Sequence, residues 1–367
     1  MTNSVLMDIN RKIRQARPLI DDANACEIYQ TDSILELSLS RGRCANDING
    51  SCIMCDYGVA SKNKPVQEYL QDMEQAIKRS SDTVRCLMLC TNGSIFDENQ
   101  VERELLEGAI DLAAKCAIPR IQLEAHYLDI NSERLSLVKK KLVNKKVIIA
   151  LGLETINQEY QDLIIGKGIN IEDFEKRITL IKSYGFNIEL NLMLGLPFLS
   201  PREQFIDALK TLKWVYLHHC RPILFPINVK PYTLLMEMYK IGLYSPISHW
   251  LILLLLEQLT EAELSQIILV WYGNRIEDYN DSALQQIPPV ACVKCLPIIE
   301  SFYIDFAATD SGVERKKIVC DTLHKPFCDC LHKTKTDLCT GNGLEFHDYY
   351  RKCTDFFEMT EKGKDLT

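Results

Sequence analysis

The sequence lacks any long apolar run. Its most hydrophobic stretch, residues 251–256, ends at Glu257, far short of the ~18 consecutive apolar residues that a membrane-spanning helix needs. Residues 1–20 also lack the apolar core of a secretion signal. These two absences predict a protein without a membrane segment, and we expect it in the cytoplasm.

An excess of positive charge is missing as well. The chain has 42 lysine and arginine residues against 50 aspartate and glutamate residues, a net charge of −8, whereas nucleic-acid-binding proteins are normally basic. We therefore expect no nucleic-acid binding without a partner protein, and we favour a small-molecule substrate. The 367 residues are enough for a sizeable core.

Cysteine, in contrast, is abundant. With no secretion signal, 15 cysteines predict a reducing compartment and metal ligation instead of disulfides. Cys44, Cys52 and Cys55 follow an apolar run with the spacing C-x7-C-x2-C. Three such thiolates can bind three irons of an iron–sulfur cube and leave the fourth iron open to another ligand. A zinc site completed from elsewhere, or burial as small apolar side chains, are the alternatives.

A second group of cysteines lies near the C-terminus. It comprises Cys292, Cys295, Cys320, Cys328 and Cys330. A C-x2-C knuckle followed by C-x-C is typical of a metal site. Zinc and a second iron–sulfur cluster both fit four thiolates. Zinc would hold a small C-terminal segment in its folded form, whereas a cluster could bind substrate or relay an electron.

Strands and helices are expected to alternate six times along the chain. The predicted strands are apolar runs at 33–39, 84–89, 120–124, 146–154, 187–194 and 222–229. Helical spacing lies between them, and a further helix is expected over 250–266. This order favours parallel β/α units.

Small and polar residues follow the predicted strands. They lie in the cysteine loop and at 91–94, 124–126, 154–155 and 195–197. In a parallel β/α barrel these loops would meet at one mouth. Backbone groups, hydroxyls and the carboxylates of Glu124 and Glu154 could there bind a compact zwitterion that carries a ribose. Taken singly, either carboxylate could instead be a structural salt-bridge partner.

A set of motifs resembles radical S-adenosylmethionine (SAM) enzymes, in particular the archaeosine-synthase radical SAM subunit, its bacterial relatives and the elongator-type group. The matching segments run in order from about residue 33 to about residue 335. They are CIMCDY at 52–57 (family C-x-M-C-G-Y), TNGSIFD at 91–97 (T-S-G-S-F-x-D), LET at 153–155 with GKG at 166–168, LGLPFL at 194–199, and the segment 232–246.

The resemblance implies a partial (β/α)6 TIM-type barrel at 33–265. An N-terminal helical extension, 1–32, would precede it, and a C-terminal cysteine-rich metal domain, 266–367, would follow. Cys44, Cys52 and Cys55 would hold a [4Fe–4S] cluster that binds and reductively cleaves SAM, with a one-electron reductant such as flavodoxin or ferredoxin. The implied SAM-binding residues are Tyr57, Thr91, Asn92, Gly93, Ser94, Glu124, Glu154 and Asn191.

One motif departs from the family. Glu124-Ala125-His126 stands where these relatives tend to have Glu-Ser-Arg. The paired hydrogen bonds that an arginine guanidinium makes to a carboxylate or phosphate are therefore lost. His126 could be a replacement contact, a proton donor or a structural histidine. We take His126 and Glu154 as candidate catalytic residues, and the departure argues for a different substrate.

The resulting hypothesis is a radical SAM enzyme, lyase or transferase, that acts on a small molecule in a specialised natural-product pathway. One variant is 3-amino-3-carboxypropyl transfer, for example to arsenite, because residues 291–295 partly resemble the R-C-C-L-K-C motif of a radical SAM enzyme of arsinothricin biosynthesis. The alternatives are a tRNA-modifying lyase of the archaeosine-synthase type that depends on a partner, and a non-catalytic zinc protein with a degenerate barrel.

Overall fold

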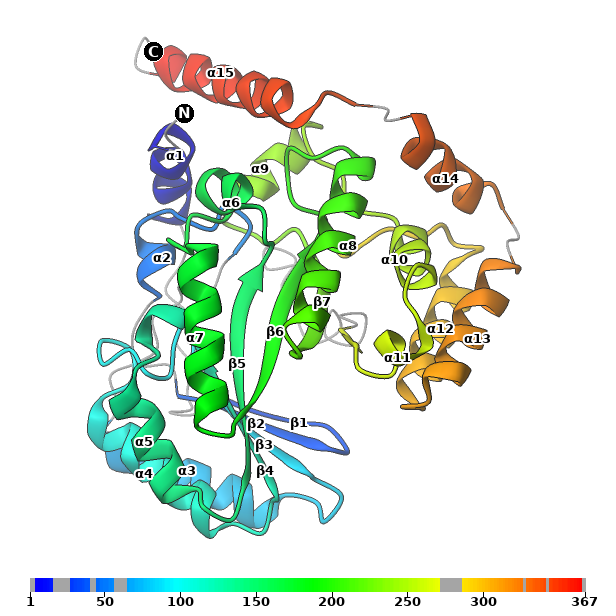
Figure 1. Cartoon of the computed structure of the whole chain (residues 1–367). Coiled ribbons are helices and arrows are strands. Elements are labelled where there is room, and N and C mark those ends of the chain that lie inside the picture. Colours follow the sequence, from blue (N-terminus) through cyan, green and yellow to red (C-terminus); the bar gives the residue numbers. More distant parts are fainter. Residues whose placement is uncertain are drawn as a thin grey trace.

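One sheet of eight strands in sequence order organises the computed structural model, which describes residues 4–15, 27–39, 44–55, 65–270, 286–325, 328–340 and 343–364. The strands are β1 (Glu27–Gln30), β2 (Ile34–Ser38), β3 (Cys86–Cys90), β4 (Arg120–Ala125), β5 (Lys146–Glu154), β6 (Asn187–Leu194), β7 (Arg221–Pro226) and β8 (Ile268–Leu269). β1 pairs antiparallel with β2, and all later pairs are parallel. The sheet curls into a partial barrel (Figure 1).

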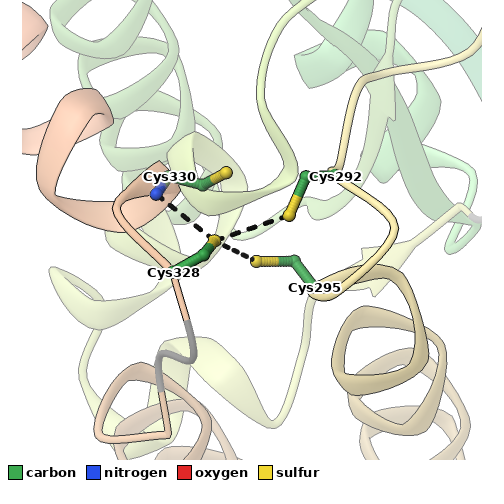
Figure 2. A group of neighbouring side chains, drawn as sticks. All are labelled: Cys292, Cys295, Cys328 and Cys330. Atoms are coloured by element: carbon green, nitrogen blue, oxygen red, sulfur yellow. Dashed lines mark hydrogen bonds between the residues drawn. The ribbon is translucent and has the colours of Figure 1, made fainter.

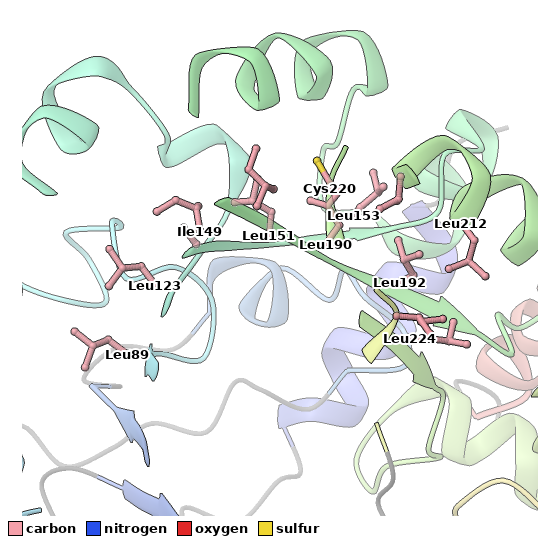
Figure 3. Packing of buried hydrophobic residues seen from close by; sticks show 14 of the residues in the cluster. Leu89, Leu123, Ile149, Leu151, Leu153, Leu190, Leu192, Leu212, Cys220 and Leu224 are labelled. Atoms are coloured by element: carbon pink, nitrogen blue, oxygen red, sulfur yellow. The ribbon is translucent and has the colours of Figure 1, made fainter. Parts of the chain in front are cut away.

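Apolar residues in register form the outer face of this sheet. Leu37 pairs with Leu89, Leu89 with Leu123, and Leu123 with Ile149, and all four are fully buried. Figure 3 shows several members of this layer under the helices. Burying each such side chain contributes ~1.5–3 kcal/mol, and a parallel sheet covered on both faces explains why the strands read as apolar runs.

Helices cover the outer face of the sheet. They are α3 (Val66–Arg79), α4 (Arg103–Lys115), α5 (Ser132–Lys141), α7 (Ile171–Ser183) and α8 (Pro201–Leu217). Local signals set their ends: Ser200 and Glu203 form a capping box at the start of α8, and Gly185, with a φ of +80°, follows α7.

Shorter elements cluster mostly in the loops. They are α2 (Ala45–Ile48), the 3-10 turn η1 (Tyr127–Asp129), α6 (Gln158–Tyr160), the π-helical turn η2 (Gln161–Ile165), α9 (Leu234–Lys240), α10 (His249–Glu257) and α11 (Glu261–Leu264). The expected single helix over 250–266 is wrong, because Thr260 and Glu263 form a capping box that starts α11 as a separate helix.

The remaining helices come from the two ends of the chain. They are α1 (Ser4–Gln15), α12 (Leu296–Ala307), α13 (Gly312–Leu323), α14 (Cys330–Thr340) and α15 (Phe346–Lys364). α15 lies beside α1 (Figure 1). Within the described part of the chain, no helix combines the length and apolarity that a bilayer crossing requires.

The predicted partial barrel is confirmed, and its six expected strands are β2 to β7. Two further strands extend it: β1 at one edge and β8 at the other. β8 lies beyond residue 265, and Ile299 and Phe302 of α12 share one apolar core with Trp250 of α10. The domain division at 265/266 stays a prediction.

Candidate active site

A cavity of about 430 Å³ opens where the parallel strands end. Thr155 and residues 195–197, which were also expected at the barrel mouth, do not line it. The cavity does bring together the predicted cluster ligands, SAM-binding residues and catalytic residues of the barrel that the structure describes. They are Cys44, Cys52, Cys55, Thr91, Asn92, Gly93, Ser94, Glu124, His126, Glu154 and Asn191. Tyr57, the remaining predicted contact, lies outside the described residues.

The cysteine loop is folded by tight backbone turns. Cys52 has a φ of +54°, its N–H donates to the carbonyl of Ile165 (2.8 Å), and the N–H of Cys55 donates back to the carbonyl of Cys52 (2.9 Å). Few non-glycine residues adopt a positive φ unless the surroundings impose it. These turns fix the positions of Cys52 and Cys55 relative to each other. The hydrogen bond to Ile165 of η2 anchors the loop to the barrel.

Helix α1 holds the same loop from the other side. Arg14 donates to the Asp47 carboxylate and to the backbone carbonyls of Cys52 and Cys55, while Asn10 donates to the carbonyl of Gly50 (2.8 Å). A Cβ atom at Gly50 would lie 2.2 Å from the carbonyl oxygen of Met7 in α1. The backbone of the N-terminal helix therefore packs directly against the backbone of the cysteine loop.

Glu154 and Lys167 form a largely buried ion pair in the cavity. The Lys167 Nζ donates to Glu154 Oε1 over 2.6 Å, and the two side chains are 21% and 4% exposed. Burial works to lower the pKa of Lys167, but the Glu154 carboxylate and the nearby thiols of Cys52 and Cys55 raise it overall. A cation is thus held beside the cysteine loop.

The backbone at Glu154 is shaped around this pair. A bulge separates Gly152 from Glu154 in β5, and Glu154 has a φ of +68°. A Cβ atom at Gly152 would lie 2.7 Å from Glu154 Oε1. Gln161 donates to the carbonyls on either side, Leu153 (2.6 Å) and Thr155 (2.5 Å). These contacts hold Glu154 in a strained backbone conformation, and residues held in this way are common at functional positions.

Glu124 is a half-buried carboxyl group on the inner face of β4. Removal of the carboxyl group from water inside the cavity, together with the nearby Glu36 carboxylate, raises its pKa to about 7. Asn191 of β6 donates to it over 3.4 Å. At neutral pH this group therefore changes readily between an acceptor and a donor of hydrogen bonds.

His126 lies at the cavity wall with a pKa lowered to about 4 by burial and by the Lys167 cation. Its Nδ1 accepts from the N–H of Leu128 (3.4 Å). The imidazole is therefore neutral near pH 7, so it offers a hydrogen bond to a ligand and not the proton of an imidazolium.

The polar atoms of the cavity fit a SAM molecule on an iron–sulfur cluster. The Oδ1 atoms of Asn191 and Asn228 are buried without a hydrogen-bond partner among the described residues, and both side chains line the cavity. Orphaned acceptors suit hydroxyl and ammonium donors. Three thiols supply cluster ligands, and carboxylates suit a ribose and a sulfonium cation.

The second cysteine group is also assembled. The Sγ atoms of Cys292, Cys295, Cys328 and Cys330 all lie within 4.8 Å of one another (Figure 2). The backbone N–H of Cys295 and the Cys328 thiol lower the pKa of Cys292 to about 6. Cys320 is not in this group: it lies in α13, whose buried face is formed by other residues.

Among the residues that the sequence analysis did not single out, three have contacts that shape the site. Lys167 pairs with Glu154, Asn228 follows β7 and lines the cavity, and Arg14 holds the cysteine loop. Only Lys167 left a signal, a lysine between Gly166 and Gly168, both of which have positive φ.

Comparisons with known proteins agree with the motifs. Archaeosine synthase subunit beta of Methanosarcina acetivorans is 26% identical over 233 residues, which cover 62% of this chain and 67% of that protein. No family model matches the chain. The predicted resemblance is confirmed: the chain is similar to this archaeosine synthase subunit.

Solved structures that align with this chain include a radical SAM enzyme. Coproporphyrinogen III oxidase (HemN) from Escherichia coli, described as a radical SAM enzyme, aligns with a TM-score of 0.38 and 16% identity over 59% of this chain and 46% of that chain. Elp3 of Methanocaldococcus infernus aligns with a TM-score of 0.45 and 15% identity over 76% and 63%. Such TM-scores describe a distant likeness, and no functional conclusion follows from them.

Proposed function

We propose that this chain is a radical SAM enzyme that modifies a small-molecule substrate in a specialised biosynthetic pathway. The observation that carries the proposal is the convergence of the three loop cysteines, the Glu154–Lys167 pair and Glu124 on one cavity at the carboxyl ends of the strands. Parallel barrels carry out their chemistry at that face. The proposed setting is the cytoplasm, with flavodoxin or ferredoxin as reductant.

Each residue has a distinct task in this proposal. Cys44, Cys52 and Cys55 would hold a [4Fe–4S] cluster, which with bound SAM would supply one-electron radical chemistry. The loop that contains Gly93 binds the methionine end of SAM through backbone and hydroxyl groups. Glu124 accepts hydrogen bonds from the ribose. A Cβ atom at Gly93 would lie 2.7 Å from the Gln100 side chain, so a glycine lets this loop pack on Gln100 beside the cavity.

The charged pair at Glu154 and Lys167 orients both ligands. The Glu154 carboxylate faces the cationic part of SAM, and the Lys167 ammonium offsets the negative charge of the thiolate-bound cluster. His126, as a neutral imidazole, offers a hydrogen bond where relatives tend to carry arginine. This replacement favours a substrate without a carboxylate or phosphate at that position.

A second candidate function comes from the sequence relative. The similarity to an archaeosine synthase subunit favours a tRNA-modifying lyase that obtains its RNA affinity from another chain. The net charge of −8 argues against tRNA binding by this chain alone. Tight, salt-sensitive tRNA binding with a partner would favour this alternative over a small-molecule substrate.

Anaerobic reconstitution followed by SAM cleavage tests the proposal. We expect about four iron atoms per chain at the cysteine loop, and SAM-derived products after addition of dithionite, identified by mass spectrometry. The C44A/C52A/C55A variant should lack both. 5′-Deoxyadenosine with methionine would indicate hydrogen abstraction, whereas methylthioadenosine would indicate 3-amino-3-carboxypropyl transfer and make arsenite the next acceptor to test. A wild-type chain without iron at the loop and without SAM turnover would refute the proposal.

SAM affinity should depend on pH through Glu124. The raised pKa of about 7 means that the carboxyl is neutral below this value and becomes an anionic acceptor above it. SAM binding should therefore strengthen by up to about tenfold between about pH 6 and about pH 8. Equilibrium binding to the oxidised, reconstituted protein measures it, and Glu124→Gln should flatten the profile. An unchanged profile in this variant would assign the titration to another group.

A further inference from the structure

The geometry of the second cysteine group distinguishes between two kinds of metal centre. Thiolates on one tetrahedral zinc ion lie about 3.8 Å apart, because each Zn–S bond is about 2.3 Å long. In a [4Fe–4S] cube every thiolate binds a different iron, so the cysteine sulfur atoms lie about 6 Å apart. The distances between the four thiols can therefore be compared with each arrangement.

The observed thiols lie at the distances of a single ion. Cys292 Sγ is 3.5 Å from Cys328 Sγ, Cys295 Sγ is 3.0 Å from Cys328 Sγ, and all four sulfur atoms lie within 4.8 Å. Figure 2 shows the four side chains converging on one point from two segments. Among the described residues, the thiols of the barrel cysteine loop do not form such a tight group.

The site also has the composition and place of a structural ion site. Its four ligands are all thiols, so no position is left open for a substrate or water. Cys295 is fully buried at the start of α12, and Cys330 begins α14. α14 has only Leu331 and Thr334 among its buried residues, which is too little apolar surface to fix a helix of this length.

We propose that Cys292, Cys295, Cys328 and Cys330 hold a single zinc ion in a closed tetrahedral site that fixes α14 to α12 and the barrel. Zinc binding supplies the folding free energy that the apolar contacts of α14 lack. Cys320 takes no part. This inference does not depend on the proposed chemistry at the barrel mouth, because it uses only the four thiols and their surroundings.

Metal analysis of the full chain tests the inference. We expect about one zinc ion per chain, with X-ray absorption at the zinc edge showing four sulfur neighbours at about 2.3 Å. The C44A/C52A/C55A variant should keep this zinc and hold almost no iron. About four iron atoms per chain in that variant would instead reveal a cluster at the second site, and would overturn the inference. So would a wild-type chain without zinc, with Cys295 and Cys328 joined in a disulfide.

Single substitutions identify the ligands. Cys328→Ser should lose most of the zinc, whereas Cys320→Ser, the matched control, should keep it. Should Cys328→Ser fail to fold, the absorption spectrum of the wild-type protein still decides the question. Zinc without iron at the barrel loop would refute the radical SAM proposal and leave the zinc inference standing, so the two failures are distinguishable.

Discussion

Arg14→Met should reduce the iron bound at the cysteine loop from about four atoms per chain to less than about one. The guanidinium donates to the carbonyls of both Cys52 and Cys55. Without it, the backbone that fixes the relative positions of these two thiolates loses both hydrogen bonds. The buried Asp47 carboxylate also loses the Arg14 cation, which should lower the free energy of unfolding, by at most about 3–5 kcal/mol. Iron analysis and denaturant unfolding measure the two effects.

Two further variants separate loop geometry from global stability. Arg14→Met/Asp47→Leu removes the buried carboxylate together with its Arg14 partner and should recover most of the stability, while iron loading stays low because the carbonyl anchors are still missing. Any residual cluster should have a more negative reduction potential, since a nearby cation favours the added electron. Lys78→Met, which removes an exposed contact to Glu74 on α3, serves as the control and should load iron normally. Full loading of Arg14→Met would refute this role.

The fold was largely predictable because its strands carry a strong signal. β5 has nine residues and β6 has eight, and most of them are buried, which gives long apolar runs. β1 and β8 have only four and two residues, so no pattern separates them from loops. The mouth residues were predictable for a related reason: parallel strands end on one side, so the loops that follow them must meet.

What the sequence could not predict depends on tertiary placement. Arg14 and Cys52 are 38 positions apart, and nothing in the pattern of α1 indicates that one face lies against the cysteine loop. In the second group, spacing alone could not show that Cys320 lies on a helix whose other side is buried. The roles of these residues depend on how helices rotate and dock, which a linear motif does not specify.

Lys167→Met should be the most destabilising change in the cavity. It leaves the carboxylate of Glu154, which is 4% exposed, without its cation, and an unpaired buried charge costs about 3–5 kcal/mol. Lys176, whose exposed side chain pairs with Asp173 and Glu172, offers a matched control: Lys176→Met should change the free energy of unfolding by less than about 0.5 kcal/mol. Denaturant unfolding of both variants provides the comparison.

A double variant then tests whether the pair serves binding or only stability. Lys167→Met/Glu154→Gln removes both charges together and should regain most of the lost stability, since no buried charge is left unpaired. If the pair orients SAM beside the cluster, the double variant should still bind SAM at least about tenfold more weakly, because one lost hydrogen bond to a charged group is worth about 1.5–3 kcal/mol. Wild-type SAM affinity in a stable double variant would show that the pair only holds the β5 bulge in place, and Glu124 would then be the main carboxylate for SAM.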